Sequence, residues 1–153
     1  MNNLFDILPE NFFNIFYKNK RIMSDCLFIL YDYMKEDTAF ASLKENVIFE
    51  LTKYFNNHIV EIDDIESHAA KDKAYYVYRR FKECKWITEE VGNNYQIYTS
   101  FEDYAIVILE AFMNLDKDSD VEYPSMVYGI YKSFINFDVE NGHKTLEAEY
   151  SRT

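Results

Sequence analysis

Glycine, proline and cysteine are all scarce in this sequence. Its 153 residues include three Gly, two Pro and two Cys. So few turn-forming residues argue against an all-β sandwich or barrel, whose many short strands need frequent tight turns. Two cysteines are also too few for the disulfide framework of a small secreted domain. Cys26 and Cys84 both fall inside apolar helical patterns, so we expect buried free thiols in a reducing compartment.

Long apolar runs and a signal peptide are missing as well. No stretch approaches the roughly 18 consecutive apolar residues of a membrane span. The first residues lack a basic segment and a small-residue cleavage site. We therefore expect a cytoplasmic protein without a membrane segment. Apolar residues make up 48% of the chain, which is enough to build a core without disulfides.

Basic residues are in the minority. Lys and Arg total 16 against 27 Asp and Glu, and the formal net charge is −11. This balance argues against general attraction to nucleic acid or anionic lipid. Residues 67–86 are the exception, because they hold six basic and two acidic side chains. This segment carries +4, which by subtraction leaves about −15 on the rest of the chain.

Apolar spacing predicts helices along most of the chain. The residues expected to face the core are, helix by helix, Ile22, Cys26, Ile29, Leu30 and Tyr33; then Val47, Ile48, Leu51 and Phe55; then Ala70, Ala74, Val77, Tyr78, Phe81 and Cys84; and then Tyr104, Val107, Ile108, Ala111, Phe112 and Leu115. Pro9 is expected at the first position of a short amphipathic helix, and Asn19 as the cap of a helix reaching about residue 35. Residues 42–45 (SLKE) fit a capping box that opens a helix to about residue 56. Ser67 would cap a helix to about residue 85. A second capping box at 100–103 (SFED) would open a further helix, and another helix would begin near residue 124.

The pattern changes to that of a β-hairpin after residue 85. Residues 86–91 and 95–99 are rich in β-branched and aromatic side chains and are separated by Gly92-Asn93-Asn94. Three helices followed by a hairpin is the winged-helix order, with the third helix as candidate recognition helix and the hairpin as wing. We predict a mainly α protein: a winged-helix domain with a short N-terminal helix over residues 1–100. A helical extension over residues 101–153 would pack on it and continue into a longer protein.

The outward face of the predicted 67–85 helix is the strongest chemical candidate. Basic side chains on a recognition helix can neutralise phosphates, and arginine can read guanine bidentately. The residues predicted to contact DNA or a partner are Lys73, Tyr75, Arg79, Arg80 and Lys82. The plain alternative is a solvated helix face whose charges pair with acidic residues of the same domain.

Aromatic residues near both ends of the chain are the second candidate. They exceed what one small core needs, and aromatic side chains supply much of the energy at protein interfaces. We predict a self-association surface formed by Phe12, Phe13, Phe16, Tyr17, Tyr128 and Tyr131. Ordinary packing of aromatic-rich helices is the alternative.

Motifs for catalysis, cofactors or metals are absent from the sequence. The three histidines share no ligand spacing. Residues 116–120 (DKDSD) imitate the start of a calcium loop, but Val121 and Val127 stand where such a loop needs glycine and glutamate. There is no Gly-rich phosphate loop. We therefore expect no enzyme, no cofactor and no metal site.

Several segments resemble the N-terminal region of the JetA family. They are residues 4–13 (LFDILPENFF), 19–20 (NK), 25–31 (DCLFILY), 72–74 (DKA), 83–87 (ECKWI) and 103–106 (DYAI). The PENFF string is the most specific of them. The family pattern would have a glycine before the wing tryptophan, where this chain has Lys85. The resemblance spans almost the whole chain but only the N-terminal part of a JetA protein.

The resemblance implies a function that the residues alone do not. JetA is similar to MukF, the kleisin of bacterial condensins, and is a subunit of the Wadjet system, which restricts plasmid DNA. Such a kleisin bridges a dimeric, MukB-like SMC ATPase, binds a MukE-like subunit and dimerises through its N-terminal winged-helix region. The implied partners are these proteins and a second copy of the chain, with only weak DNA contact. The alternatives are a winged-helix transcriptional regulator and a small enzyme or ligand-binding protein.

Overall fold

The computed structural model describes residues 2–116, so predictions for residues 117–153 lie outside the described residues. The chain divides into two compact units after Leu109. The first unit contains nearly every described element, and residues 110–116 are the described part of the second. The elements are the 3-10 helices η1 (Leu4–Asp6) and η2 (Phe12–Phe16), then α1 (Lys20–Met34), β1 (Ala41–Leu43), α2 (Lys44–Asn57), α3 (Ala70–Glu83), β2 (Ile87–Val91), β3 (Ile97–Phe101) and α4 (Asp103–Asn114).

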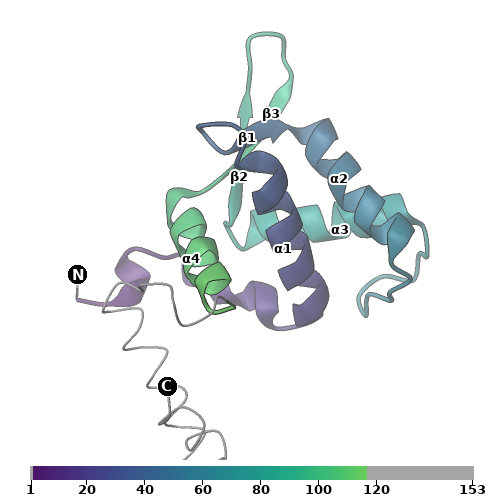
Figure 1. Cartoon of the computed structure of the whole chain (residues 1–153), viewed down its shortest axis with the longest axis horizontal. Helices are drawn as coiled ribbons and strands as arrows, with labels where there is room; N and C mark the ends of the chain where they lie inside the picture. The colour runs from purple at the N-terminus through teal and green to yellow at the C-terminus, as the bar shows by residue number, and fades with distance from the viewer. Residues whose placement is uncertain (1, 117–153) are drawn as a thin grey trace, which may run out of the picture. The chain divides into compact units, whose positions relative to one another are not determined.

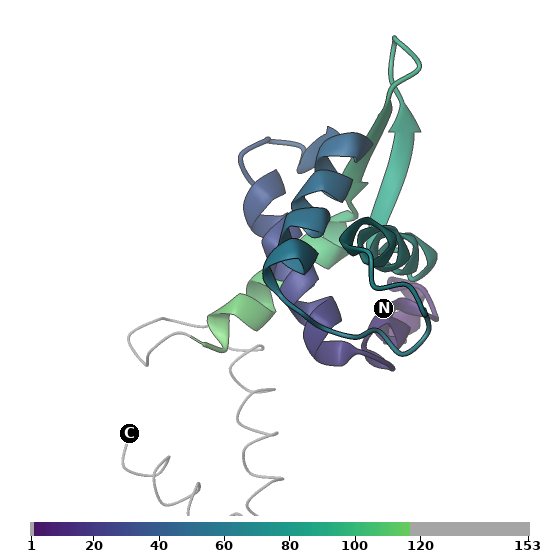
Figure 2. The same cartoon turned by 90° about the vertical axis from the view of Figure 1, so that its right-hand side faces the viewer.

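The predicted winged-helix fold is confirmed. The helices α1, α2 and α3 precede the β2–β3 hairpin, which projects from them as a wing (Figure 1). α2 packs against both α1 and α3. In the view of Figure 2, α3 is seen nearly along its axis while α2 runs across the picture, so the two helices cross at a large angle. α3 therefore occupies the position of a recognition helix beside the wing.

A third strand, β1, was not predicted. It pairs with β3, and the antiparallel sheet has the order β1–β3–β2. The capping box predicted at 42–45 is wrong, because Ser42 lies in β1 opposite Thr99 and Leu43 directly precedes α2. The Ser42 hydroxyl instead approaches the Tyr33 hydroxyl at 3.3 Å. A three-residue strand has too little local pattern to be recognised without its distant partner.

The predicted core of α2 is confirmed, whereas α1 buries a slightly different face. α2 buries all four predicted residues, namely Val47, Ile48, Leu51 and Phe55. α1 begins after Asn19 as predicted, but Asn19 has a left-handed φ of 55° and makes no side-chain capping bond. The buried residues of α1 are Met23, Cys26, Leu27, Leu30, Tyr31 and Met34. Ile22 and Ile29, predicted inward, are only half-buried.

α3 begins two residues later than a helix capped by Ser67 would, because Ala69 and not Ser67 is at the cap position. The Ser67 hydroxyl accepts a hydrogen bond from the Ala69 N–H at 3.2 Å and donates to Asp72 at 2.6 Å. These bonds shape the turn before the helix. The predicted inner face is confirmed apart from the half-buried Ala70: the structure buries Ala74, Val77, Tyr78, Phe81 and Cys84.

The turn from α3 to the wing is a Schellman motif with lysine at the position that usually holds glycine. The Trp86 N–H donates to the Phe81 carbonyl at 2.9 Å, and the Lys85 N–H donates to the Lys82 carbonyl at 3.1 Å. Lys85 has a φ of 61°, a conformation that costs a residue with a Cβ roughly 1–2 kcal/mol. Replacing the expected glycine therefore leaves the geometry of the turn unchanged but adds strain.

The N-terminal segment packs against the base of the wing. The amphipathic helix predicted from Pro9 is wrong, because the segment forms two 3-10 helices and Pro9 lies between them. Phe12 is fully buried and stacks on Trp86 with ring centroids 3.9 Å apart. The Trp86 indole N–H donates to the Phe12 carbonyl at 2.8 Å, which satisfies the one polar atom of a buried indole.

The wing itself follows the predicted hairpin, with its second strand beginning two residues later. The Gly92 N–H donates to the Gln96 carbonyl at 2.7 Å, and the Tyr95 N–H donates to the Gly92 carbonyl at 3.1 Å. Tyr95 takes the left-handed conformation, with a φ of 59°. These features define a three-residue loop built on a type I turn. Tyr95, and neither Asn93 nor Asn94, is the non-glycine residue of this turn with a positive φ.

α4 begins at Asp103, two residues later than the predicted capping box would start it. The capping box at 100–103 is wrong, because Ser100 lies in β3. Within the first unit, α4 buries Ala105 and Leu109. Val107, predicted inward, is 68% exposed. Among the described residues, no helix combines the length and apolar character needed to cross a bilayer.

Candidate interaction surfaces

The basic face predicted on α3 is only partly open to a partner. Tyr75 and Arg79 are exposed. None of the ion pairs among the described residues involves Arg79. The other three predicted contact residues, Lys73, Arg80 and Lys82, are all engaged within the domain.

Lys73, predicted on the flank of this basic face, is buried instead. Lys73 is only 6% exposed, and its ammonium group donates to the Val60 carbonyl at 2.5 Å. The aliphatic stem of a lysine can be buried against apolar neighbours while its charged end reaches a carbonyl. Lys73 therefore fastens the connector between α2 and α3 to the recognition helix, and it does not belong to the exposed face.

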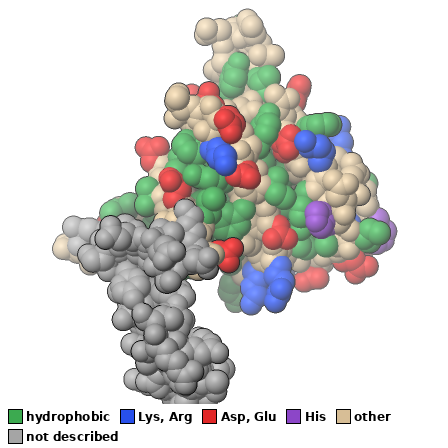
Figure 3. Space-filling view, viewed as in Figure 1, with side chains coloured by type: hydrophobic (Ala, Val, Ile, Leu, Met, Phe, Trp, Pro, Cys, Tyr) green, Lys and Arg blue, Asp and Glu red, His purple; other side chains and the backbone are tan. Residues whose placement is uncertain are grey.

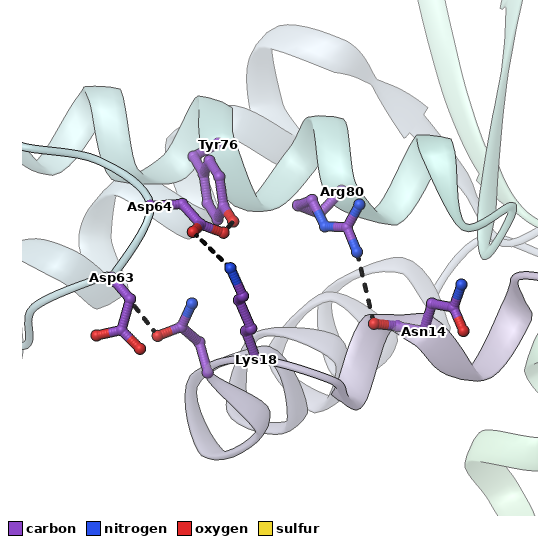
Figure 4. A network of polar contacts seen from close by, with 7 residues as sticks. Asn14, Lys18, Asp63, Asp64, Tyr76 and Arg80 are labelled. Carbon is purple, nitrogen blue, oxygen red and sulfur yellow. Dashed lines mark hydrogen bonds and ion pairs between the residues drawn. The ribbon is translucent and has the colours of Figure 1, made fainter.

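Arg80 lies at the edge of a polar cleft between the N-terminal segment, the connector and α3 (Figure 4). Its guanidinium group pairs with Glu83 at 2.8 Å and contacts the Asn14 carbonyl at 3.5 Å. In the same cleft, of about 370 Å³, Asp64 accepts hydrogen bonds from the Tyr76 hydroxyl at 2.5 Å and from Lys18 at 3.2 Å. These two bonds hold the pKa of the Asp64 carboxyl below its usual value. The cleft thus joins three segments through its own polar groups.

Lys82 is paired with a carboxylate of the wing. Glu89 accepts hydrogen bonds from Lys82 at 2.6 Å and from the Tyr78 hydroxyl at 2.5 Å, and it pairs with Lys44 at 3.2 Å. Burial opposes the ionisation of Glu89, but these three donors outweigh it and lower its pKa to about 2. The Tyr78 hydroxyl also contacts Thr99 at 2.7 Å. This network connects both wing strands to α2 and α3.

The exposed part of the wing carries apolar and neutral polar side chains and the carboxylate of Glu90, but no basic side chain. Residues 86–102 contain no Lys or Arg, and the projecting hairpin in Figure 3 shows no basic side chain. Sequence reasoning did not single out its exposed apolar residues, which are Val91, Tyr95, Ile97 and Tyr98. The sequence does indicate them, because apolar side chains continue on both strands up to the turn. A hairpin of this length extends past the core, so the apolar residues near its tip remain exposed.

The predicted aromatic interface is reduced by burial. Phe12 cannot belong to it, because it is fully buried against Trp86. Phe16 is half-buried and meets the same indole edge-on. Phe13 is 38% exposed and Tyr17 is 86% exposed. Tyr128 and Tyr131 lie outside the described residues.

Three further apolar residues of the N-terminal segment are exposed. They are Leu4, Phe5 and Ile7, and the Phe5 ring meets the Phe13 ring edge-on at 6.5 Å. We call these three residues with Phe13 and Tyr17 the N-terminal apolar surface. All three precede Pro9, where the predicted helical spacing begins, so the apolar pattern did not indicate them.

Groups able to hold a metal or act as nucleophiles are few in the described region. Within residues 2–116, no cluster of three or more His, Cys, Asp or Glu side chains has the geometry of a metal site. Cys26 and Cys84 are free and buried, and burial raises the pKa of both thiols. A protonated buried thiol is a poor nucleophile.

Comparison with known proteins identifies the family. The family model described as Wadjet protein JetA matches residues 29–153. A Wadjet protein JetA from Bacillus cereus (strain Q1) is 28% identical over 148 residues, which cover 92% of this chain and 32% of that protein. The chain thus spans about a third of the length of this relative. No solved structure matches the chain. Because the family model covers most of the sequence, including α2, α3 and the wing, the chain belongs to the JetA family.

Proposed function

We propose that this chain is a non-catalytic interaction domain from the N-terminal part of a kleisin-like JetA subunit. In this proposal it associates with a second copy and docks onto the SMC ATPase and a MukE-like subunit of a cytoplasmic Wadjet complex that restricts plasmid DNA. Membership in the JetA family supports the Wadjet assignment. The proposed partners follow from the resemblance of JetA to MukF.

Three of the basic side chains of α3 are bound within the domain, and this observation favours contact with a protein over contact with DNA. Nucleic-acid affinity comes largely from Lys and Arg that neutralise phosphates. On α3, however, Lys73 binds a carbonyl, Arg80 binds Glu83 and Lys82 binds Glu89. The wing contributes no cation at all. A phosphate backbone approaching α3 and the wing would meet three exposed cations that take part in none of the ion pairs among the described residues, Lys71, Arg79 and Lys85, with the exposed carboxylate of Glu90 nearby on the wing.

The N-terminal apolar surface is the best-supported place for self-association. Exposed aromatic side chains that cluster on one segment contribute large contact areas at protein interfaces. Tyr17 is almost fully exposed, and Phe13 lies beside Phe5. The surface lies on a segment that Phe12 anchors to the core, so a partner would meet a fixed set of side chains.

Light scattering on the whole chain over a wide concentration range tests the self-association. We expect a dimer that dissociates when Tyr17→Asp is introduced. Tyr95→Asp is the matched control, because Tyr95 is an equally exposed aromatic residue on the wing, and it should leave the dimer intact. A monomer at every concentration would overturn the proposed dimer. Failure to co-purify with the SMC ATPase of the same Wadjet system would overturn the docking role.

Exposed Arg79 and Tyr75 keep DNA binding by a transcriptional regulator as a second candidate function. It predicts duplex binding at low salt that weakens steeply as salt is added and is lost in Arg79→Glu. A gel-shift series without binding at low salt would dispose of it.

A further inference from the structure

The sheet leaves the first residue of β3, Ile97, without a neighbour on the β1 side. β1 ends at Leu43, opposite Tyr98, and the chain then turns into α2. β2, in contrast, accompanies β3 as far as the pair of Val91 and Ile97. Toward the tip of the wing, β3 is therefore covered on one side only, and Ile97 has no strand partner on its other side among the described residues.

The backbone of Ile97 faces this open edge. In an antiparallel pair, alternate residues direct their peptide groups toward the same neighbour. The bond from the Gly92 N–H to the Gln96 carbonyl shows that Gln96 faces β2. Ile97 therefore faces the opposite side. Phe101 lies four residues after Ile97 and so directs its peptide group to the same side. Its N–H donates to the Phe40 carbonyl on the β1 side at 3.2 Å.

A groove lies at this place. Its volume is about 270 Å³. It is lined by Leu43, Lys44, Glu45, Tyr95, Gln96 and Ile97, and we call it the wing groove. Its apolar walls come from Leu43, Ile97 and the 91% exposed Tyr95. The position of the groove, directly beyond the last residue of β1, matches the path that a longer β1 would have taken.

The charged side chains that line the groove are Lys44 and Glu45, and only Glu45 lacks an ion pair among the described residues. Lys44 is paired with Glu89, whose carboxylate stays ionised because its pKa is lowered to about 2. Glu45 and Glu90 are exposed, and none of the ion pairs among the described residues involves them. Glu45 also lies in the first turn of α2, where it offsets the positive end of the helix dipole. The groove therefore suits apolar and basic side chains and disfavours an anion.

We propose that the wing groove binds an extended segment of a partner protein as a continuation of β1. The segment lies alongside β3, places an apolar side chain on Ile97 and directs a Lys or Arg toward Glu45. Strand addition of this kind takes its affinity from main-chain hydrogen bonds and its specificity from alternate side chains. This inference goes beyond the function proposed above, because it concerns a different surface and does not require the chain to dimerise.

Titration of the ¹⁵N-labelled chain with a blocked octapeptide of alternating Val and Lys tests the proposal. We expect saturable shifts confined to the backbone amides around Tyr95 and Ile97. A peptide of alternating Val and Glu should bind at least about tenfold more weakly. Glu45→Lys should weaken binding of the Val–Lys peptide by a similar factor while leaving the fold intact. Val107→Lys, which changes an exposed apolar residue outside the wing, should have no effect.

Four outcomes would overturn this assignment. They are the absence of saturable shifts at millimolar peptide, shifts centred on Arg79, equal binding of the Val–Glu peptide, and insensitivity to Glu45→Lys. If the same wing amides shift with protein concentration alone, the groove belongs to a second copy and not to a partner segment. Tyr17→Asp changes the N-terminal apolar surface and leaves the wing untouched. Loss of the dimer in Tyr17→Asp therefore tests the proposed function alone, and loss of peptide binding in Glu45→Lys tests the wing groove alone.

Discussion

The indole of Trp86 lies flat against the ring of Phe12, with ring centroids 3.9 Å apart and planes 14° apart. The indole N–H also donates to the Phe12 carbonyl at 2.8 Å, and both side chains are fully buried. Two segments far apart in the sequence are thereby joined at the base of the wing. Phe12 was predicted to lie at an interface, but because of this contact it is part of the core.

Phe12→Ala should lower the free energy of unfolding by roughly 3–5 kcal/mol, because it removes a buried ring and leaves a cavity beside Trp86. Urea denaturation followed by tryptophan fluorescence measures this change. Tyr17→Ala is the control, since its exposed ring should matter by no more than about 0.5 kcal/mol. Similar losses in the two variants would contradict the packing described here.

Lys85→Gly should raise the free energy of unfolding by about 1 kcal/mol. Glycine adopts the left-handed conformation of this turn without the steric cost that lysine bears. Lys85→Ala keeps a Cβ and should give no such gain, so the difference between the two variants isolates the backbone effect. Thermal or urea unfolding reports both. A glycine variant no more stable than the alanine variant would mean that Lys85 is not strained.

Glu89→Gln should destabilise the domain by about 1–2 kcal/mol near neutral pH, because the carboxylate binds Lys82, Tyr78 and Lys44. This value is below what the full pKa shift implies, since the two lysines are partly exposed and screened by solvent. Glu90→Gln, at the exposed neighbouring position, is the control and should have little effect. Equal stability of the Glu89 and Glu90 variants would contradict the role of this network.

The contribution of Glu89 should also depend on pH. Its pKa is lowered from 4.5 to about 2 in the folded protein. The unfolded state therefore binds the proton more readily, and stability falls as the pH drops. The contribution is fully present above about pH 4.5 and is lost as the pH falls through about 2. Unfolding curves of the native protein and Glu89→Gln should converge over this range, and parallel curves would count against the shift.

Lys73→Glu should destabilise the domain by more than about 3 kcal/mol, since a buried carboxylate would face the Val60 carbonyl without a cation. Arg79→Glu on the same helix should change stability by no more than about 0.5 kcal/mol, because Arg79 is exposed. Circular dichroism during urea unfolding distinguishes the two. If Lys73→Glu were as well tolerated as Arg79→Glu, Lys73 would belong to the exposed basic face after all.

The winged-helix architecture could be predicted because it rests on local signals. Apolar residues at helical spacing identified the inner faces of α2 and α3, and a change to β-branched and aromatic runs identified the wing. Helix starts were predicted less well. Ser42 and Ser100 both have the sequence of a capping residue, but each lies in a strand instead. Pairing with β3 and with neighbouring strands gives these backbones better hydrogen bonds than a local cap would.

The sequence by itself determined the helical faces, the hairpin and the resemblance to JetA, since each depends on the identity and spacing of neighbouring residues. Only the tertiary structure decided which basic and aromatic side chains reach the surface. Lys73 and Phe12 have the sequence context of exposed contact residues, yet Val60 and Trp86 bury them. Burial depends on partners that lie far away in the sequence, and no local pattern records where those partners will pack.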